Sequence, residues 1–199
     1  MRTLLDRLAN GDPAPGGGAV AAASGAMGVA LQSMALRHTL AKRIDESLRA
    51  ELTTRLADCE ALRTRIAGFV DVDGAAVRRL IDAYRLPAAG PGRADAIEAA
   101  MLGAIQSPLD LAAACVDGLR QARRCVEACH RNVAGDAAAG AIALQSALRI
   151  CTTNVAANAQ GLRDADRATW LRDTASAMLA EGMPLAESAL RTASERLTH

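Results

Sequence analysis

The chain has 199 residues, of which 51% are hydrophobic and 2% aromatic, with a formal net charge of +1. The hydrophobic content excludes a disordered chain, and the length fits one well-buried domain. The balanced charge and the scarcity of aromatic rings argue against nucleic-acid binding, which uses basic patches and stacking side chains. A core with so few rings must be filled by small aliphatic side chains, which pack well only between close helices, so we expect an all-α fold.

Apolar residues recur at helical spacing along the chain, and Gly- and Pro-rich breaks separate the segments. The pattern predicts helices over residues 1–10, 19–43, 45–84, 93–131, 137–162 and 164–197. A kink or short loop is expected at Pro108, and a further kink near Pro184, because proline removes a helical hydrogen bond. No stretch alternates with a period of two. We therefore expect one domain spanning 1–199, a bundle of long antiparallel helices without strands.

The compartment is inferred from the cysteines and the N-terminus. The five cysteines show no framework spacing and follow no signal peptide, so reduced thiols in a cytoplasmic protein are expected. The apolar stretch 19–36 is rich in Ala and Gly and contains Gln32 and two serines. It predicts a buried helix of a soluble protein better than a membrane span, so no membrane partner is expected.

Asp73 interrupts the apolar stripe of the long third segment, between Val70 and Val77. A carboxylate on such a stripe costs free energy unless it is paired or protonated. One interpretation is that "DVDG" is a local break in which Asp73 caps a helix or faces solvent. The other is a buried acid with a raised pKa, which suits proton transfer.

Other polar residues also lie on apolar stripes. Asn154 and Asn158 are spaced i, i+4 in the fifth segment, where they either tie helices together or bind an amide-like edge of a ligand. Asp136 at the start of that segment is typical of a helix N-cap. Cys125, Cys129 and His130 are too few for a metal site, so no metal is expected.

The stretch "DPAPGGGAVAAASGAMG" combines a proline, three consecutive glycines and a run of small residues. Gly16, Gly17 and Gly18 allow unusual backbone conformations and expose N–H groups at a helix N-terminus, which favours an anion or a closely approaching ligand. The stretch is not a Walker loop, because no Lys-Ser/Thr pair follows. The small residues after it predict close helix packing, either within the chain or in a dimer.

Several quoted stretches are similar to motifs of one known family. "PAPGGGAVAAASGAMGVALQSM" resembles a PTPGGGS-type opening, and "DVDGAAVRRLIDAYRLP" resembles D-x-x-A-F…A-Y-x-L-P. Arg93 with Ile97 and "SPL" resembles R-x-x-x-I…P-L, "RNVAGDAA" resembles N-x-x-S-D, and "NVAANAQGLRD" resembles N-V-x-x-N. In register over nearly the whole chain, these motifs resemble the formiminotransferase-cyclodeaminase / methenyltetrahydrofolate cyclohydrolase family.

The resemblance implies an all-α homodimer that binds a tetrahydrofolate derivative near the subunit interface, with no tightly bound cofactor. It favours the cyclohydrolase, which adds water to 5,10-methenyltetrahydrofolate and forms 10-formyltetrahydrofolate. The alternatives are the cyclodeaminase, which releases ammonia from 5-formimino-tetrahydrofolate, and a divergent, non-catalytic helical interaction protein.

The matched motifs also imply roles for individual residues. Asp73 or Asp136 would be the general acid/base, and the loop 16–18 would let the folate approach the backbone. The remaining matched residues would bind substrate: Asn154 and Asn158 by orienting the pterin or water, Lys42 and Arg93 at the glutamate carboxylates, and Asn132 as a further contact.

The chain departs from the family pattern at several of these motifs. Ala14 and Ala19 stand where the family has Thr and Ser around the glycines, Gly135 replaces a Ser, and Val77 replaces a Phe. Hydroxyl donors are therefore missing at expected site positions, which leaves room for a divergent substrate or weakened activity.

Overall fold

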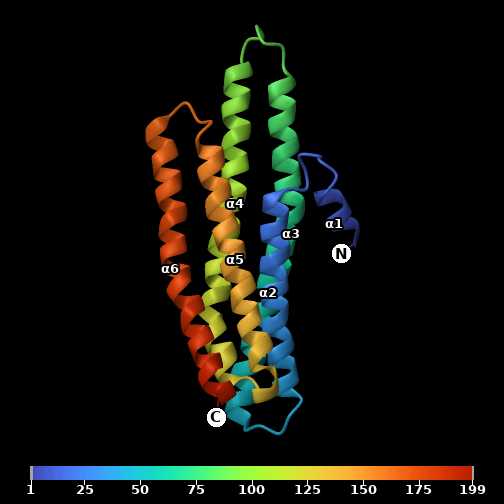
Figure 1. Ribbon diagram of the computed structural model, residues 1–199, viewed down its shortest axis with the longest axis vertical. Coiled ribbons are helices and arrows are strands. Elements are labelled where there is room, and N and C mark those ends of the chain that lie inside the picture. The colour runs from blue at the N-terminus through green and yellow to red at the C-terminus, as the bar shows by residue number, and fades with distance from the viewer. Residues whose placement is uncertain (1, 199) are drawn as a thin grey trace.

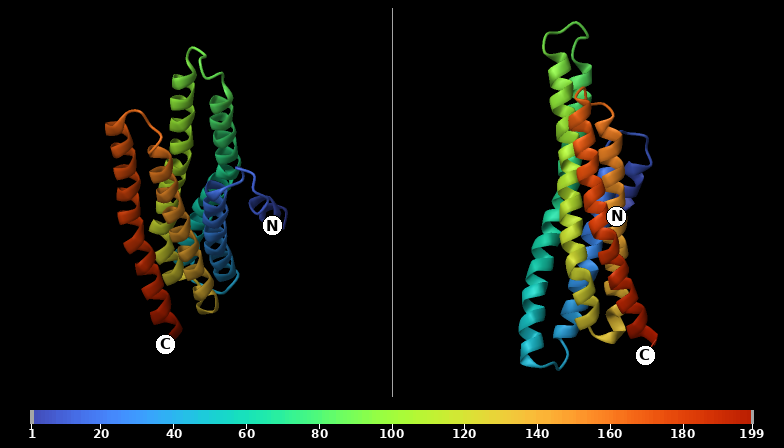
Figure 2. Two further views of the ribbon diagram at one scale, coloured as in Figure 1. Left: turned by 45° about the horizontal axis from the view of Figure 1, so that its top comes forward. Right: turned by 90° about the vertical axis from the view of Figure 1, so that its left-hand side faces the viewer.

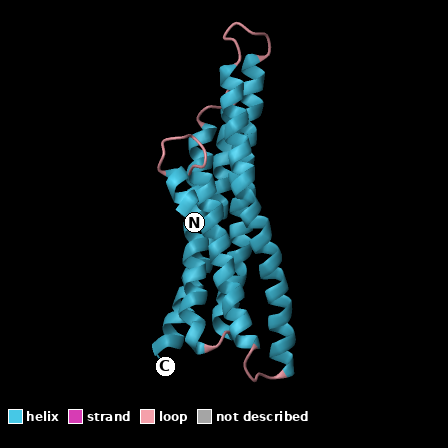
Figure 3. Cartoon of the chain, turned by 90° about the vertical axis from the view of Figure 1, so that its right-hand side faces the viewer, coloured by secondary structure: helices cyan, strands magenta, loops and turns pink. Residues whose placement is uncertain are grey.

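The computed structural model describes residues 2–198 and confirms the all-α fold, with no strand among those residues (Figure 3). The helices are α1 (Arg2–Leu8), α2 (Gly17–Leu40), α3 (Glu46–Arg85), α4 (Arg93–Ala128), η1 (Arg131–Val133), α5 (Ala134–Ala159) and α6 (Ala165–Thr198). The predicted segments match these helices with ends that differ by up to three residues. Met1, which was expected in the first helix, lies outside the described residues.

The long helices α2 to α6 run alternately up and down in one bundle (Figure 1). The α3–α4 hairpin extends beyond the other helices at one end, which is the top in Figure 1. The short α1 lies beside the bundle near the start of α2, as the turned views also show (Figure 2). The upper end of the bundle is the end with the α3–α4 hairpin, and the starts of α1 and α2 lie some way below the tip of this hairpin. The lower end carries the α2–α3 and α4–α5 connections.

The small residues after the glycine loop pack within the chain. A Cβ added at Gly28 of α2 would lie 2.6 Å from the carbonyl oxygen of Gly140 in α5, and the reverse substitution would meet Gly28 at the same distance. Gly25, one turn earlier, lies against Ile66 and Cys115. The backbones of α2 and α5 therefore touch where the middle of α2 meets the first third of α5, which only glycine at both positions permits.

Helix α3 begins with an N-cap at Asp45, whose side chain accepts a hydrogen bond from the Leu48 amide at 2.8 Å. The helix then continues without interruption to Arg85. The interpretation of "DVDG" as a local break is therefore wrong, because the long apolar stripe on both sides of it keeps these residues helical.

Of the kink or short loop predicted at Pro108, the short loop is wrong, since α4 is continuous from Arg93 to Ala128. The predicted N-cap at Asp136 is wrong as well, because α5 already begins at Ala134 and Asp136 lies exposed in its first turn. The preceding η1 turn leads directly into α5, which moves the helix start three residues ahead of the predicted one.

The main core lies between α2, α3, α4 and α5, and small side chains fill much of it. Helices α2 and α4 are long and apolar enough to span a membrane, but more than half of each apolar stretch is buried inside the bundle. Central helices of soluble bundles have the same character.

Candidate active site at the start of helix α2

Asp73 of α3 lies directly against the first turn of α2. A Cβ added at Gly18 would overlap the Asp73 carboxylate, so a side chain at that position would displace the carboxylate from the first turn of α2. Gly16 is the N-cap of α2 and supplies no side-chain hydrogen bond. The backbone N–H of Ala19 instead lies close enough to the Asp73 carboxylate to stabilise its charge. Asp73 therefore caps α2 from a neighbouring helix, where the positive end of the helix dipole favours its charge.

The pKa of Asp73 is raised above its ordinary value, mainly because burial removes water from the carboxylate, while the Ala19 amide acts in the lowering direction. The side chain is only partly buried, so it stays accessible to a ligand. The direction of this pKa shift agrees with the second interpretation, although the carboxylate is half-buried rather than fully buried. A desolvated carboxylate with a raised pKa is a better proton acceptor at neutral pH than an exposed one.

Asn154 of α5 joins this site. A Cβ added at Gly17 would lie 3.2 Å from Asn154 Oδ1 and 3.4 Å from Nδ2, with Cγ further away at 3.8 Å, so the polar edge of the carboxamide faces the glycine. The carboxamide is half-buried and forms no hydrogen bond within residues 2–198. Its donor and acceptor therefore remain available beside Asp73. We define this cluster, Gly17, Gly18, Asp73 and Asn154, as the upper cluster.

Asn158 lies one turn further along α5 and has a different partner. Its Nδ2 donates to the backbone carbonyl of Ala104 in α4 at 3.0 Å. That carbonyl lacks its usual helical partner, because the residue four positions later is Pro108. Of the two interpretations for Asn158, this contact favours the one in which it ties helices together.

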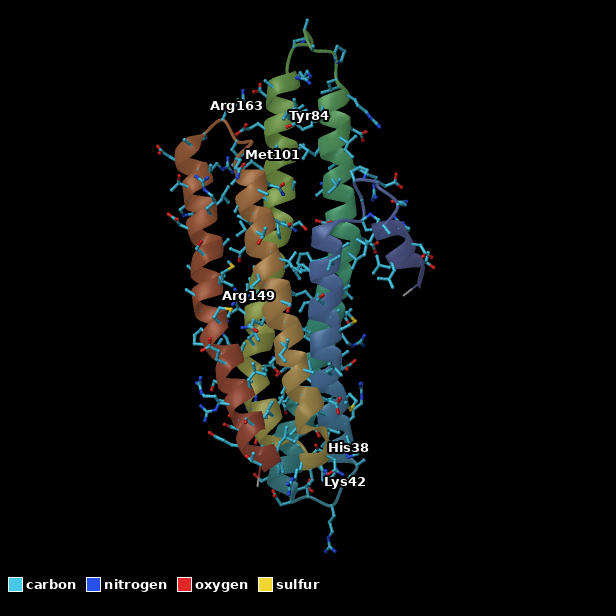
Figure 4. All side chains as sticks on the ribbon, viewed as in Figure 1. His38, Lys42, Tyr84, Met101, Arg149 and Arg163 are labelled. Atoms are coloured by element: carbon cyan, nitrogen blue, oxygen red, sulfur yellow. The ribbon has the colours of Figure 1, made fainter. Side chains whose placement is uncertain are left out.

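Lys42, Asn132 and Asp136 lie at the other end of α2 and α5. Lys42 follows the end of α2 at the bottom of the bundle, close to His38 (Figure 4). The His130 amide donates to Thr39 Oγ1 at 2.7 Å, which brings the η1 turn with Asn132 to the same end. Twenty residues of helix separate Gly18 from His38, or about 30 Å. Within one chain these residues cannot share a ligand with Asp73.

This second group also contains two histidines. The rings of His38 and His130 pack edge to face, with centroids 5.6 Å apart. His38 Nε2 is buried and has no hydrogen-bond partner within the described part of the chain. We define His38, Lys42, Asn132 and Asp136 as the lower cluster.

Arg93 belongs to neither cluster. It lies at the start of α4, and its guanidinium donates to the carbonyls of Leu86 at 3.0 Å and Tyr84 at 3.1 Å. These carbonyls end α3, so Arg93 closes the α3–α4 hairpin. The predicted contact with a substrate carboxylate would require this side chain to leave both carbonyls.

Two residues near the upper cluster were missed by the sequence analysis. Arg78 lies over the glycine at position 74, with Nη1 3.3 Å from where a Cβ would be, and Arg7 of α1 lines the same small cavity. The sequence feature that could have indicated Arg78 is Gly74, one helical turn earlier. A missing side chain at that position leaves room for the side chain four residues later.

No group of three or more His, Cys, Asp or Glu side chains suited to a metal ion occurs in residues 2–198. The polar groups that the structure gathers at this site are the Asp73 carboxylate, the Asn154 carboxamide and the amides of the first turn of α2. They suit proton transfer and hydrogen bonding to a flat, polar molecule.

Comparison with known proteins agrees with the motifs. The formiminotransferase-cyclodeaminase family model matches residues 1–177. A methenyltetrahydrofolate cyclohydrolase from Methylorubrum extorquens is 33% identical over 99% of this chain and 97% of its own length. A formimidoyltransferase-cyclodeaminase from Sus scrofa is 34% identical over 56% of this chain, which is 21% of that protein.

A solved structure supports the fold. The crystal structure of formiminotetrahydrofolate cyclodeaminase from Thermotoga maritima matches all of this chain and 95% of its own, with a TM-score of 0.82 at 23% identity. Since the family model covers most of the chain and a full-length relative exceeds 30% identity, the chain belongs to the formiminotransferase-cyclodeaminase family.

Proposed function

We propose that the protein is a methenyltetrahydrofolate cyclohydrolase, which converts 5,10-methenyltetrahydrofolate and water into 10-formyltetrahydrofolate. The observation that carries the proposal is the Asp73 carboxylate, desolvated and pressed against the first turn of α2. The Methylorubrum extorquens relative, which matches over nearly its full length, is named methenyltetrahydrofolate cyclohydrolase. This supports the cyclohydrolase over the cyclodeaminase as the activity of this chain.

The reaction needs one group that moves protons. Water attacks the electrophilic amidinium carbon, and Asp73 takes the proton that this water releases. The carbon–nitrogen bond to the ring then breaks as the hydroxyl becomes a carbonyl, and the ring nitrogen gains the second proton of the water. One proton leaves to solvent overall. The pKa of Asp73, raised by burial, makes its carboxylate basic enough to accept and return a proton.

The remaining residues of the upper cluster orient the substrate. The free carboxamide of Asn154 can both donate to and accept from the pterin edge or the attacking water. The missing side chains at Gly17 and Gly18 let the ligand approach the backbone amides of α2. No tightly bound cofactor takes part, since the folate itself is the substrate.

We also propose that the protein is a homodimer that uses the exposed face of α2 and α5. Met27, Met34 and Ile142 are exposed on these helices. No charged residue occurs between positions 20 and 34 or between 137 and 148. Two helices of about 36 Å side by side offer roughly 700 Å², close to the ~800 Å² per partner of a stable interface. Helices that are apolar on every side are normally covered.

An antiparallel arrangement of the two copies would join the two clusters. The upper and lower clusters lie at opposite ends of α2 and α5, and these helices cross where Gly28, midway along α2, contacts Gly140 and Leu144 of α5. A two-fold axis at that crossing places the upper cluster of one protomer beside the lower cluster of its partner. Asp136, Asn132 and Lys42 then contribute to the site from the second copy.

The cyclodeaminase activity is the alternative within the family, and a non-catalytic role is the alternative outside it. Ala14 and Ala19 lack the hydroxyls that the family carries around the glycines, which is what favours a divergent function. The buried free thiols fit the proposed cytoplasmic, reducing location.

The test is the decay of 5,10-methenyltetrahydrofolate absorbance with and without the protein, at a pH where spontaneous hydrolysis is slow. Faster decay with 10-formyltetrahydrofolate as product supports the cyclohydrolase. Ammonia release from 5-formimino-tetrahydrofolate without methenyl hydrolysis would replace it by the cyclodeaminase. If both activities were absent and calorimetry detected no binding of reduced folates, the non-catalytic interaction protein would be the remaining hypothesis.

A further inference from the structure

A small cavity lies between α1, the glycine loop and α3, on the outer side of the upper cluster. Its volume is about 70 Å³. Leu4, Pro15 and Val70 form its apolar sides, and Arg7, Arg78 and Asp71 are its charged residues. This space is about that of two water molecules, so it suits one small polar group and excludes a ring system.

The two arginines reach the cavity from different elements. Arg7 comes from the last turn of α1, whereas Arg78 comes from α3, five residues after Asp73. The Arg78 guanidinium lies against Gly74, with Nη1 3.3 Å and Nη2 4.0 Å from the position of a Cβ. The missing side chain at Gly74 therefore lets the guanidinium lie close to the backbone of α3, at the edge of this cavity.

Both arginines lack ion pairs within residues 2–198, although many arginines of the bundle are paired with carboxylates there, such as Arg124 with Glu51 and Arg163 with Asp95. The cavity carries one carboxylate, Asp71, against two guanidinium groups, which leaves an excess positive charge. An unpaired guanidinium fork at the edge of a cavity fits a carboxylate well.

The arginines also leave Asp73 undisturbed. The pKa of Asp73 is raised by burial and opposed by the Ala19 amide, and no cation contributes to it. A cation that touched Asp73 would lower its pKa and weaken it as a base. The arginines can therefore bind an anion beside the site while the acid keeps its raised pKa.

We propose that Arg7 and Arg78 bind a carboxylate of the glutamate end of the folate substrate, outside the glycine loop. This inference rests on the proposed function and assigns the role that the sequence pattern gave to Lys42 and Arg93. Arg93 closes the α3–α4 hairpin, and Lys42 lies at the opposite end of the protomer from Asp73.

The experiment compares two substrates that differ only at the glutamate. The purified full-length chain and the variants Arg78→Ala, Arg7→Ala and Arg78→Lys are assayed with 5,10-methenyltetrahydrofolate and with 5,10-methenyltetrahydropteroate. Arg79→Ala is the matched control, because Arg79 is an exposed neighbour on α3 that lines other grooves.

For Arg78→Ala we expect the KM for the folate to rise at least tenfold, with kcat within twofold and the KM for the pteroate unchanged. Arg7→Ala should give the same pattern more weakly, and Arg78→Lys should recover part of the loss. An unchanged KM for the folate, or equal rises for both substrates, would overturn the inference.

Calorimetry with tetrahydrofolate and tetrahydropteroate measures the same contrast without turnover. If the wild-type chain binds tetrahydrofolate but hydrolyses no methenyl compound, the cyclohydrolase proposal fails while the arginine site is still tested. Equal affinity of the wild-type chain and Arg78→Ala for tetrahydrofolate would overturn the arginine site alone. If the wild-type chain bound neither compound, both proposals would fall.

Discussion

Asn158 of α5 donates from Nδ2 to the backbone carbonyl of Ala104 in α4 across 3.0 Å. This carbonyl would accept from the amide of residue 108 in an ordinary helix, but Pro108 has no N–H to give. A side chain from a neighbouring helix therefore supplies the hydrogen bond that proline removes. This explains how α4 continues through Pro108 and why a polar residue lies on the apolar stripe of α5.

Asn158→Ala should lower the free energy of unfolding by about 1–3 kcal/mol, the cost of leaving a buried carbonyl without a partner. In a Pro108→Ala background the same change should cost less, because the new amide of residue 108 can donate to Ala104. Urea denaturation of the four chains in this double-mutant cycle measures the coupling. Additive losses, with no coupling between positions 108 and 158, would contradict the pairing.

The Cβ introduced by Gly18→Ala overlaps the Asp73 carboxylate. Activity should therefore fall by about 100-fold or more, as expected for the loss of a general base. The free energy of unfolding should also fall, by about 1–3 kcal/mol. Gly68→Ala is the control, since a Cβ at that exposed position of α3 meets nothing within 4 Å. It should stabilise the helix by about 0.5–1 kcal/mol. Thermal melts and turnover are measured for both; normal activity in Gly18→Ala would remove the upper cluster from the mechanism.

Asp73→Asn should separate activity from stability. Turnover should fall by about 10²–10⁴-fold, because the amide cannot accept the proton from water. The amide oxygen can still accept from the Ala19 amide, so the fold should remain intact.

The pH dependence of stability follows from the raised pKa of Asp73. The folded wild-type chain bears the cost of a desolvated charge only when this carboxyl is ionised. The cost is absent below an unfolded pKa of about 4, grows as pH rises through the folded pKa, and is constant above it. Urea denaturation from pH 4 to 8 should therefore show Asp73→Asn equal to wild type at pH 4 and more stable at pH 7. A variant less stable than wild type at pH 7 would contradict this sign.

The sequence was sufficient to predict the helices and the upper cluster for a physical reason. Helical periodicity shows which residues share a face, so a single carboxylate on the α3 stripe and a carboxamide on the α5 stripe are visible as exceptions. Asp73 and Asn154 were found in this way, and the structure places both at the start of α2.

Contacts between helices are not encoded in periodicity. The capping of α2 by Asp73, the pairing of Asn158 with Ala104, and the convergence of Arg7 and Arg78 each depend on the register of one element against another. The motif match placed Arg93 in the site, whereas the structure places it at the α3–α4 hairpin. A motif gives the order of residues along the chain and does not say which neighbour each side chain contacts.

Arg93→Ala decides between hairpin closure and substrate binding. Loss of its two hydrogen bonds to the carbonyls of Tyr84 and Leu86 should destabilise the chain by about 1–2 kcal/mol. The KM for 5,10-methenyltetrahydrofolate should stay within twofold of wild type. Thermal melts and steady-state kinetics on one preparation measure both effects. A KM that rises tenfold in a chain of unchanged stability would return Arg93 to the substrate site.

Mixing two inactive variants tests the antiparallel dimer. Asp73→Asn alters the upper cluster and Asp136→Asn the lower one, and about 30 Å of α2 separates these clusters within a protomer. If each site takes Asp73 from one copy and Asp136 from its partner, a hybrid dimer has one doubly altered site and one intact site. Subunits exchanged in equal amounts should then recover about a quarter of wild-type activity, since half of the dimers are hybrids with one working site.

Ile142→Arg is the matched control for this exchange, because it places a charge on the apolar α2–α5 face and leaves both clusters unchanged. It should convert the dimer to a monomer in light scattering and abolish recovery when it is added to both variants. Full activity of Asp136→Asn alone would exclude the lower cluster from the site. Two inactive variants that exchange subunits without any recovery would show that the two clusters do not combine across the interface.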